Sequence, residues 1–245
     1  MSIEIKHNKE PKLVMPSFSV DDILAEKLNK YDILKLMNKS NFTLFLGKAG
    51  SGKSSLLIGL LGSKTSFRKV YNQIFLFCPP NSRQSIKNGF WSKLADDQIY
   101  DELNLENLQE VYESAQKNAE EGYKTLIILD DVQKALKGKC EKFLLHIINN
   151  RRHSFISIWI AAQNYFQIPK SVRSGLTDIF LFKASRKEIE SINEEQVETS
   201  QDKFLDILHK YCFKEPHDFM YVNTNTQRLF SNWDEIIIKD NMIEN

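Results

Sequence analysis

Residues 42–55 read Phe42-Thr43-Leu44-Phe45-Leu46-Gly47-Lys48-Ala49-Gly50-Ser51-Gly52-Lys53-Ser54-Ser55, an apolar run that leads into a glycine-rich turn. The turn matches G-x-x-x-x-G-K-[ST] at every fixed position, and a helical pattern follows it. Glycines let such a backbone wrap around an anion, with N–H groups and the helix N-terminus pointing at phosphate oxygens. The Lys53 ammonium can reach the β and γ phosphates, and the Ser54 hydroxyl can bind Mg²⁺. We therefore expect a nucleotide-binding loop from Gly47 through Ser55.

Short apolar runs alternate with helical patterns on both sides of this loop. Each run lacks the alternation of a half-exposed strand, so we expect strands that are buried on both faces of a parallel sheet. The expected strands are 42–46, 73–77, 125–129, 155–161 and 178–182. The expected helices are 53–61, 105–119, 139–150, 185–193 and 201–211, with an earlier one over 19–37. The pattern predicts an α/β fold with a mainly parallel sheet sandwiched by helices, closed by a C-terminal hairpin at 219–230.

Length and composition indicate a single large domain. The chain has 245 residues, 42% of them hydrophobic, and its 33 Lys and Arg nearly balance 32 Asp and Glu. Near-neutrality argues against a polybasic nucleic-acid binder. Three scattered cysteines and the lack of an apolar leader or a long apolar run predict a soluble intracellular protein with no membrane partner. We expect an N-terminal arm and helix over 1–40, a nucleotide-binding domain over 41–233 and a tail over 234–245.

Two acidic residues follow the apolar run Leu126-Ile127-Ile128-Leu129. A buried parallel strand would deliver Asp130 and Asp131 to the same sheet edge as the glycine-rich loop. There Asp130 would hold Mg²⁺, and Asp131 would act as general base toward an attacking water. An apolar run that ends in acids is often only a strand leaving the core. The glycine-rich loop upstream favours the functional interpretation.

The next expected strand carries polar residues at both ends. Gln163 follows it and can sense the γ-phosphate and orient water, unless it only caps the strand-to-loop turn. Arg151 and Arg152 precede the strand, at the edge away from the chain's own nucleotide. That position suits an arginine that reaches a neighbouring subunit's site, or basic residues that stabilise a helix C-terminus. Arg173, in the loop after the strand, is a third candidate.

Charge is segregated along the chain. Residues 96–121 hold nine acids and one base, whereas residues 134–152 hold six bases and one acid. Lys134, Lys137 and Lys139 are candidates for sequence-independent, salt-sensitive contacts with DNA phosphates. The alternative is a solvated helix face. We expect the acidic segment to be a solvated, partly helical insertion; the alternative is a surface that docks to a capsid or another basic partner.

Several motifs together resemble the genome-packaging ATPases of large DNA viruses and virophages, the poxvirus-type group of the FtsK/HerA superfamily. They are residues 47–55, 126–131, Asn150-Arg151-Arg152-His153, Ala161-Ala162-Gln163-Asn164, residues 168–173 and the closing hairpin. The resemblance spans residues 41–233. It implies a RecA-like P-loop NTPase core, ATP and Mg²⁺ as cofactors, and a homo-oligomeric ring, usually a hexamer, that pumps double-stranded DNA.

The resemblance also implies roles for individual residues. Lys53 and Ser54 would bind phosphate and Mg²⁺, Asp130 and Asp131 would form the Walker B pair, and Gln163 would be the sensor. Arg152 is the implied finger in trans, with Arg151 and Arg173 as alternatives. Asp131 departs from the general pattern, in which Glu is commoner. Capsid vertex proteins are further implied partners, and the site of virus assembly or the virion the implied location.

Three other functions share some of these motifs. Asn29-Lys30-Tyr31-Asp32 spells the guanine-selective N-K-x-D pattern, but it precedes the loop inside an expected helix. A P-loop kinase of a nucleotide or small metabolite fits the length, but no arginine-rich lid is evident. A nucleotide-gated assembly or scaffold protein that hydrolyses slowly also fits, although it does not require all of Lys53, Ser54, Asp130 and Asp131.

Overall fold

The computed structural model describes residues 2–6, 33, 36–37, 40–64, 66–84, 90–197 and 199–239. Their strands form one ten-stranded sheet in the order β1-β10-β9-β8-β7-β2-β6-β5-β3-β4. The strands are β1 (Ser2–Lys6), β2 (Phe42–Leu46), β3 (Gln73–Phe77), β4 (Ile99–Tyr100), β5 (Thr125–Asp130), β6 (Ile156–Ala162), β7 (Asp178–Phe182), β8 (Phe219–Asn223), β9 (Arg228–Ser231) and β10 (Asp234–Lys239). All five strands expected from apolar runs are present, within a residue of their expected bounds.

The half of the sheet from β7 to β4 is parallel. Strand β2 lies between β6 and β7, and β5 pairs with β6 and β3. Every residue of β2, β5, β6 and β7 is buried. Burial on both faces explains why these strands read as continuous apolar runs.

The other half of the sheet is antiparallel. Strands β8 and β9 form the expected hairpin, β10 pairs with β9, and β1 pairs with β10. The sheet therefore extends beyond Trp233, and a peripheral tail from residue 234 is wrong for Asp234–Lys239. The run Ile236-Ile237-Ile238 alternates between faces, and Ile236 and Ile238 pack on the core side. This short strand is stabilised by pairing with its neighbours in the sheet, β9 and β1.

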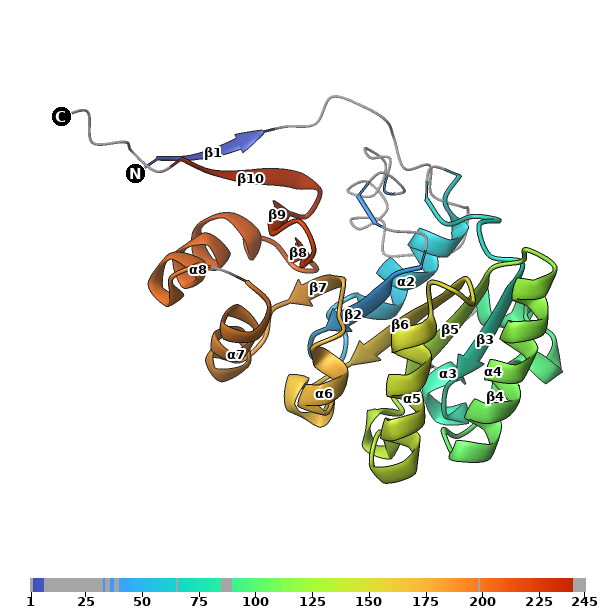
Figure 1. Cartoon of the computed structure of the whole chain (residues 1–245). Coiled ribbons are helices and arrows are strands. Elements are labelled where there is room, and N and C mark those ends of the chain that lie inside the picture. The colour runs from blue at the N-terminus through green and yellow to red at the C-terminus, as the bar shows by residue number, and fades with distance from the viewer. Residues whose placement is uncertain are drawn as a thin grey trace.

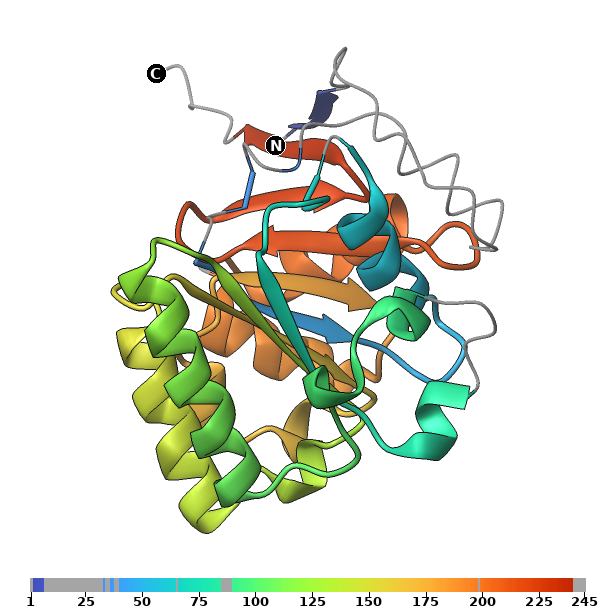
Figure 2. The same ribbon diagram turned by 90° about the vertical axis from the view of Figure 1, so that its right-hand side faces the viewer.

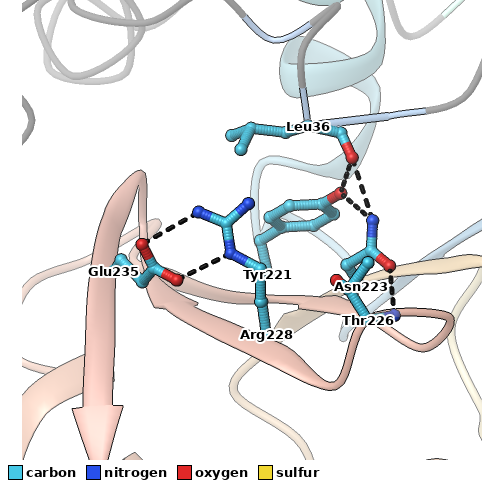
Figure 3. Close-up of polar contacts among 6 residues, drawn as sticks. All are labelled: Leu36, Tyr221, Asn223, Thr226, Arg228 and Glu235. Atoms are coloured by element: carbon cyan, nitrogen blue, oxygen red, sulfur yellow. Dashed lines mark hydrogen bonds and ion pairs between the residues drawn. The ribbon is translucent and has the colours of Figure 1, made fainter.

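Side chains of the hairpin hold two other segments in place (Figure 3). The Tyr221 hydroxyl and the Asn223 amide both donate to the carbonyl oxygen of Leu36, at 3.3 and 2.9 Å. The Arg228 guanidinium donates twice to the Glu235 carboxylate, at 2.6 and 2.9 Å, which joins β9 to β10. The rest of the expected helix over 19–37, including Asn29 to Asp32, lies almost wholly outside the described residues.

Helices cover both faces of the sheet. They are α2 (Lys53–Gly62), α3 (Pro80–Gln84), α4 (Leu105–Glu120), α5 (Gly138–Asn150), α6 (Lys170–Arg173), α7 (Arg186–Gln196) and α8 (Gln201–Ile207), which continues as a π-helix over Leu208–Cys212. Helices α4 and α5 lie side by side on one face and α2 lies on the other (Figures 1 and 2). The sandwiched sheet expected from the sequence is confirmed. Among the described helices, none has the length and apolar content to span a bilayer.

Alternate residues of the strands pack into two separate hydrophobic cores, one on each face of the sheet. Phe42, Leu44 and Leu46 pack with the apolar stripes of α4, α5, α7 and α8. Phe45 faces the other way and packs with α2 and Trp159. The acidic segment is no insertion, because α4 buries Leu108, Val111 and Ala115 and turns its acids outward. Its charge reflects only the solvent face of an amphipathic helix.

Candidate functional site

Strand register brings the expected site residues to one edge of the sheet. Leu46 of β2 pairs with Ala162 of β6, and Asp130 of β5 pairs with Ala161. Because these strands are parallel, the residues that follow them leave the sheet together, and Gly47 N–H donates to the Ala162 carbonyl at 3.2 Å. The glycine-rich loop, both aspartates and Gln163 therefore share the carboxyl edge.

Two glycines of the loop are required by its geometry. Gly52 has φ 101°, in the left-handed region that favours glycine, and directly precedes α2. A Cβ on Gly47 would lie 2.6 Å from both Phe182 Cβ and Ser51 Oγ. The loop thus closes tightly against β7 while its apex, Lys48 to Gly50, stays exposed.

Lys53 begins α2 and folds back over the loop. Its ammonium donates to the carbonyls of Gly47, at 2.7 Å, and Lys48, at 3.0 Å. Burial lowers the pKa of Lys53, and the negative charges of Asp130 and Asp131 oppose that shift. The ammonium is held at the loop by carbonyl oxygens that a phosphate can replace as acceptors.

Asp130 ends β5 and is 7% exposed. Burial, with repulsion from Asp131, raises its pKa from the ordinary 3.8 to about 6, against the attraction of Lys53. The Cys78 thiol lies 3.9 Å from Asp130 Oδ2. A buried carboxylate with this little compensation is an unfavourable arrangement that a bound cation would relieve.

Asp131 is exposed and stands in the left-handed region, with φ 57°. The Gln163 amide nitrogen lies 3.5 Å from its Oδ1, and the Ser82 hydroxyl donates to its Oδ2 at 2.9 Å. The contact with Gln163 brings together two residues that the sequence placed at neighbouring strand ends. Ser82 was missed, because no motif marks a serine in the segment after β3.

These residues line one cavity of about 170 Å³, formed by Ala49, Gly50, Lys53, Ser54, Ser82, Asp130, Asp131, Ala161 and Gln163. Ser54 and Asp130 offer it a hydroxyl and a carboxylate, the hard oxygen donors that Mg²⁺ prefers alongside substrate phosphates. The donor set and the raised pKa of Asp130 fit a magnesium site. Ser55 lies one residue further along α2, is half-buried and does not line the cavity.

A second cavity, of about 430 Å³, lies on the other side of the loop apex. It shares Ala49 and Gly50 with the first and is otherwise lined mainly by Phe182, Lys183 and the segment 213–218. Asp218 shapes that segment by accepting from the N–H groups of Lys214, at 3.1 Å, and Glu215, at 2.7 Å. Sequence reasoning assigned this segment no role, since the segment itself matches no nucleotide-binding motif.

The three candidate arginines have different surroundings. Arg151 is buried and donates to the carbonyls of Ser40 and Ile148. Arg173 is buried too, paired with Glu195 at 3.2 Å and stacked over Tyr165. Arg152 is exposed in the turn between α5 and β6, at the edge opposite the loop. As arranged here, Arg151 and Arg173 hold the fold together, which argues against a role for either in trans.

Lys134, Lys137 and Lys139 are all exposed. They lie between the end of β5 and the first turn of α5, beyond Asp130 and Asp131 and on the carboxyl side of the sheet. A shared exposed position is compatible with contacts to a polyanion and equally with a solvated surface.

The sheet order, the glycine-rich loop after the central strand and the acids at the end of β5 define a P-loop NTPase fold. The chain belongs to the poxvirus A32 protein family, whose model matches residues 28–241. This match confirms the resemblance to poxvirus-type packaging ATPases that the motifs predicted.

One curated viral protein is similar to part of the chain. The chain is 29% identical over 143 residues to uncharacterized protein 015R of Frog virus 3 (isolate Goorha), across 56% of this chain and 42% of that protein. It therefore spans less than half the length of this curated relative.

Solved structures share the fold. The genome packaging NTPase B204 of Sulfolobus turreted icosahedral virus 2, in complex with ATP-gammaS, superposes with a TM-score of 0.58 at 17% identity, over 79% of this chain and 97% of that one. Its complex with AMP gives 0.56 at 16% identity, over 83% and 100%. EssC of Geobacillus thermodenitrificans gives 0.51 at 15% identity, over 94% and 44%. At these identities the likeness concerns the fold.

Proposed function

We propose that this chain is a Mg²⁺-dependent ATPase motor that translocates double-stranded DNA and packages a viral genome into a preformed capsid. One observation carries the proposal: Lys53, Ser54, Asp130, Asp131 and Gln163 surround one cavity in a member of the A32 family. This set contains a phosphate ligand, a cation site, a base and a polar orienting group, which is what hydrolysis of a nucleoside triphosphate requires.

We infer the orientation of the nucleotide from the two cavities. The γ-phosphate belongs in the cavity of Asp130 and Asp131, because the cation and the base act there. The shared apex, Ala49 and Gly50, then carries the rest of the phosphate chain, and the nucleoside enters the second cavity. Its volume of about 430 Å³ falls in the ordinary range for small-molecule sites.

The residues divide the chemistry among them. Lys53 exchanges its carbonyl partners for phosphate oxygens, and Ser54 and Asp130 hold Mg²⁺. Bound Mg²⁺ supplies positive charge against the phosphate oxygens. Asp131 accepts the proton of the attacking water while Gln163, whose amide already lies 3.5 Å from that carboxylate, orients the water.

The remaining parts of the proposal concern assembly. Arg152, exposed at the opposite edge, reaches the nucleotide of a neighbouring subunit in a homo-oligomeric ring, a hexamer by family resemblance. Lys134, Lys137 and Lys139 contact DNA phosphates. The ring works at the site of virus assembly in the host cell, with capsid vertex proteins as partners.

Hydrolysis of ATP, with and without long duplex DNA across a salt series, tests the proposal, with Lys53→Ala as the blank. The expected result is stimulation by DNA that fades with salt, because phosphate contacts release counterions. Activity in the folded Lys53→Ala variant would remove the site assignment. Phosphoryl transfer to a nucleoside or small metabolite would instead identify a kinase, and near-zero turnover with or without DNA would favour a scaffold.

A further inference from the structure

Asp131 is the one Walker B acid with an exposed carboxylate, and its two oxygens contact different elements. Oδ2 accepts from the Ser82 hydroxyl of α3 at 2.9 Å, and Oδ1 lies 3.5 Å from the Gln163 amide after β6. An exposed aspartate can adopt several rotamers, so donors on both oxygens restrict it to one. The shorter contact is the one from Ser82.

Parallel pairing of β3 with β5 places Ser82 beside Asp131. Phe77, the last residue of β3, pairs with Leu129. Consequently Cys78 lies next to Asp130, and the short helix that follows β3 brings its Ser82 to Asp131. The contact therefore arises from the same register that assembles the rest of the site.

The segment that carries Ser82 is itself anchored. The N–H of Arg83 donates to the Pro79 carbonyl at 3.1 Å, and the Arg83 guanidinium pairs with Asp101 at 2.9 Å. Asp101 follows β4, the edge strand beside β3. The turn that carries Ser82 is thus held beside β4 by the ion pair between Arg83 and Asp101.

We infer that Ser82 is a positioning residue for Asp131, which its hydroxyl holds in the orientation that accepts a proton from the attacking water. This role rests on the proposed ATPase function. Because Ser82 donates to the base, we expect its loss to act on turnover more than on nucleotide binding. Loss of a hydrogen bond to this charged group is expected to lower kcat roughly tenfold.

The test compares Ser82→Ala with Ser82→Thr, which keeps the hydroxyl, in the full chain. Asn81→Ala is the matched control, since Asn81 is the exposed neighbour in the same turn. We expect Ser82→Ala to lower kcat roughly tenfold with KM for ATP unchanged, and Ser82→Thr to retain most of the rate. Asn81→Ala should resemble the wild type.

A double-mutant comparison separates positioning from general damage. On an Asp131→Ala background, Ser82→Ala should produce no further fall, because the group that it positions is gone. A full additional fall, a rise in KM alone, or wild-type kcat in Ser82→Ala would overturn the positioning role while leaving the ATPase intact. A wild-type chain that binds ATP but does not hydrolyse it with DNA would overturn the proposed function and this role together.

Discussion

Asp130→Asn is expected to stabilise the empty protein while abolishing hydrolysis. Asp130 is 7% exposed, and burial raises the pKa of its carboxyl from 3.8 to about 6. A folded-state pKa above the unfolded value means that the folded chain binds the proton more tightly. Ionised Asp130 therefore destabilises the fold in full above about pH 6, and this effect declines as the pH falls towards the unfolded pKa of 3.8.

The magnitude follows from that shift. About two pKa units, at about 1.4 kcal/mol each, correspond to about 3 kcal/mol at neutral pH. That shift already includes the attraction between Asp130 and Lys53, but asparagine still buries a polar amide, which costs about 1–2 kcal/mol. We therefore expect a net gain of about 1–2 kcal/mol, or about 3–6 °C in Tm for a chain of this size.

Thermal unfolding of both proteins at about pH 7.5 and about pH 4.5 measures the effect. Asp131→Asn should give a smaller gain, because it relieves only the repulsion between the two carboxylates and leaves Asp130 buried. Mg²⁺ with a non-hydrolysable ATP analogue should then raise the Tm of the wild type more than that of Asp130→Asn, because only the wild type keeps the cation ligand.

Equal Tm values for wild type and Asp130→Asn at both pH values, without ligand, would refute the reasoning. They would mean that water reaches Asp130 and that its charge is not desolvated. A gain of the same size at both pH values would also contradict it, since a charge effect must shrink as Asp130 takes up its proton.

Three further predictions address the nucleotide, the ring and DNA. His217→Ala in the second cavity should weaken ATP binding several-fold, as measured by calorimetry, and leave the binding of inorganic tripolyphosphate unaffected. Tyr123→Ala, at an exposed residue that lines neither cavity, is the control. Equal loss for both ligands would place the nucleoside elsewhere. Arg152→Ala should bind ATP without hydrolysing it, and mixing it with Asp131→Ala subunits should restore part of the rate; no recovery at any mixing ratio would argue against action in trans. The salt dependence of DNA binding should weaken in a triple variant that combines Lys134→Ala, Lys137→Ala and Lys139→Ala. If each lysine contacts one phosphate, the slope of log affinity for duplex DNA against log salt concentration should fall in magnitude by about 3. An unchanged slope would mean that these lysines face solvent.

Much of the fold and the core of the site could be predicted because their signals are local. The glycine-rich loop is contiguous from Gly47 to Ser54, and the backbone conformations at Gly50 and Gly52 are properties of those residues. The buried strands are recognisable in the sequence as apolar runs, since burial on both faces requires apolar residues throughout. Asp130, Asp131 and Gln163 were predicted from their positions after such runs.

Tertiary structure decided what depends on contacts between distant segments. Ser82 and Asp131 are 49 residues apart and meet only through the register of β3 with β5. Adjacent Arg151 and Arg152 are indistinguishable in sequence, yet the chain's turn after α5 buries the first and exposes the second. Strands β1 and β10 join opposite ends of the chain through backbone hydrogen bonds, which side-chain pattern does not encode. Motifs of neighbouring residues can be recognised in the sequence, whereas contacts between distant residues across the sheet form only when the chain packs.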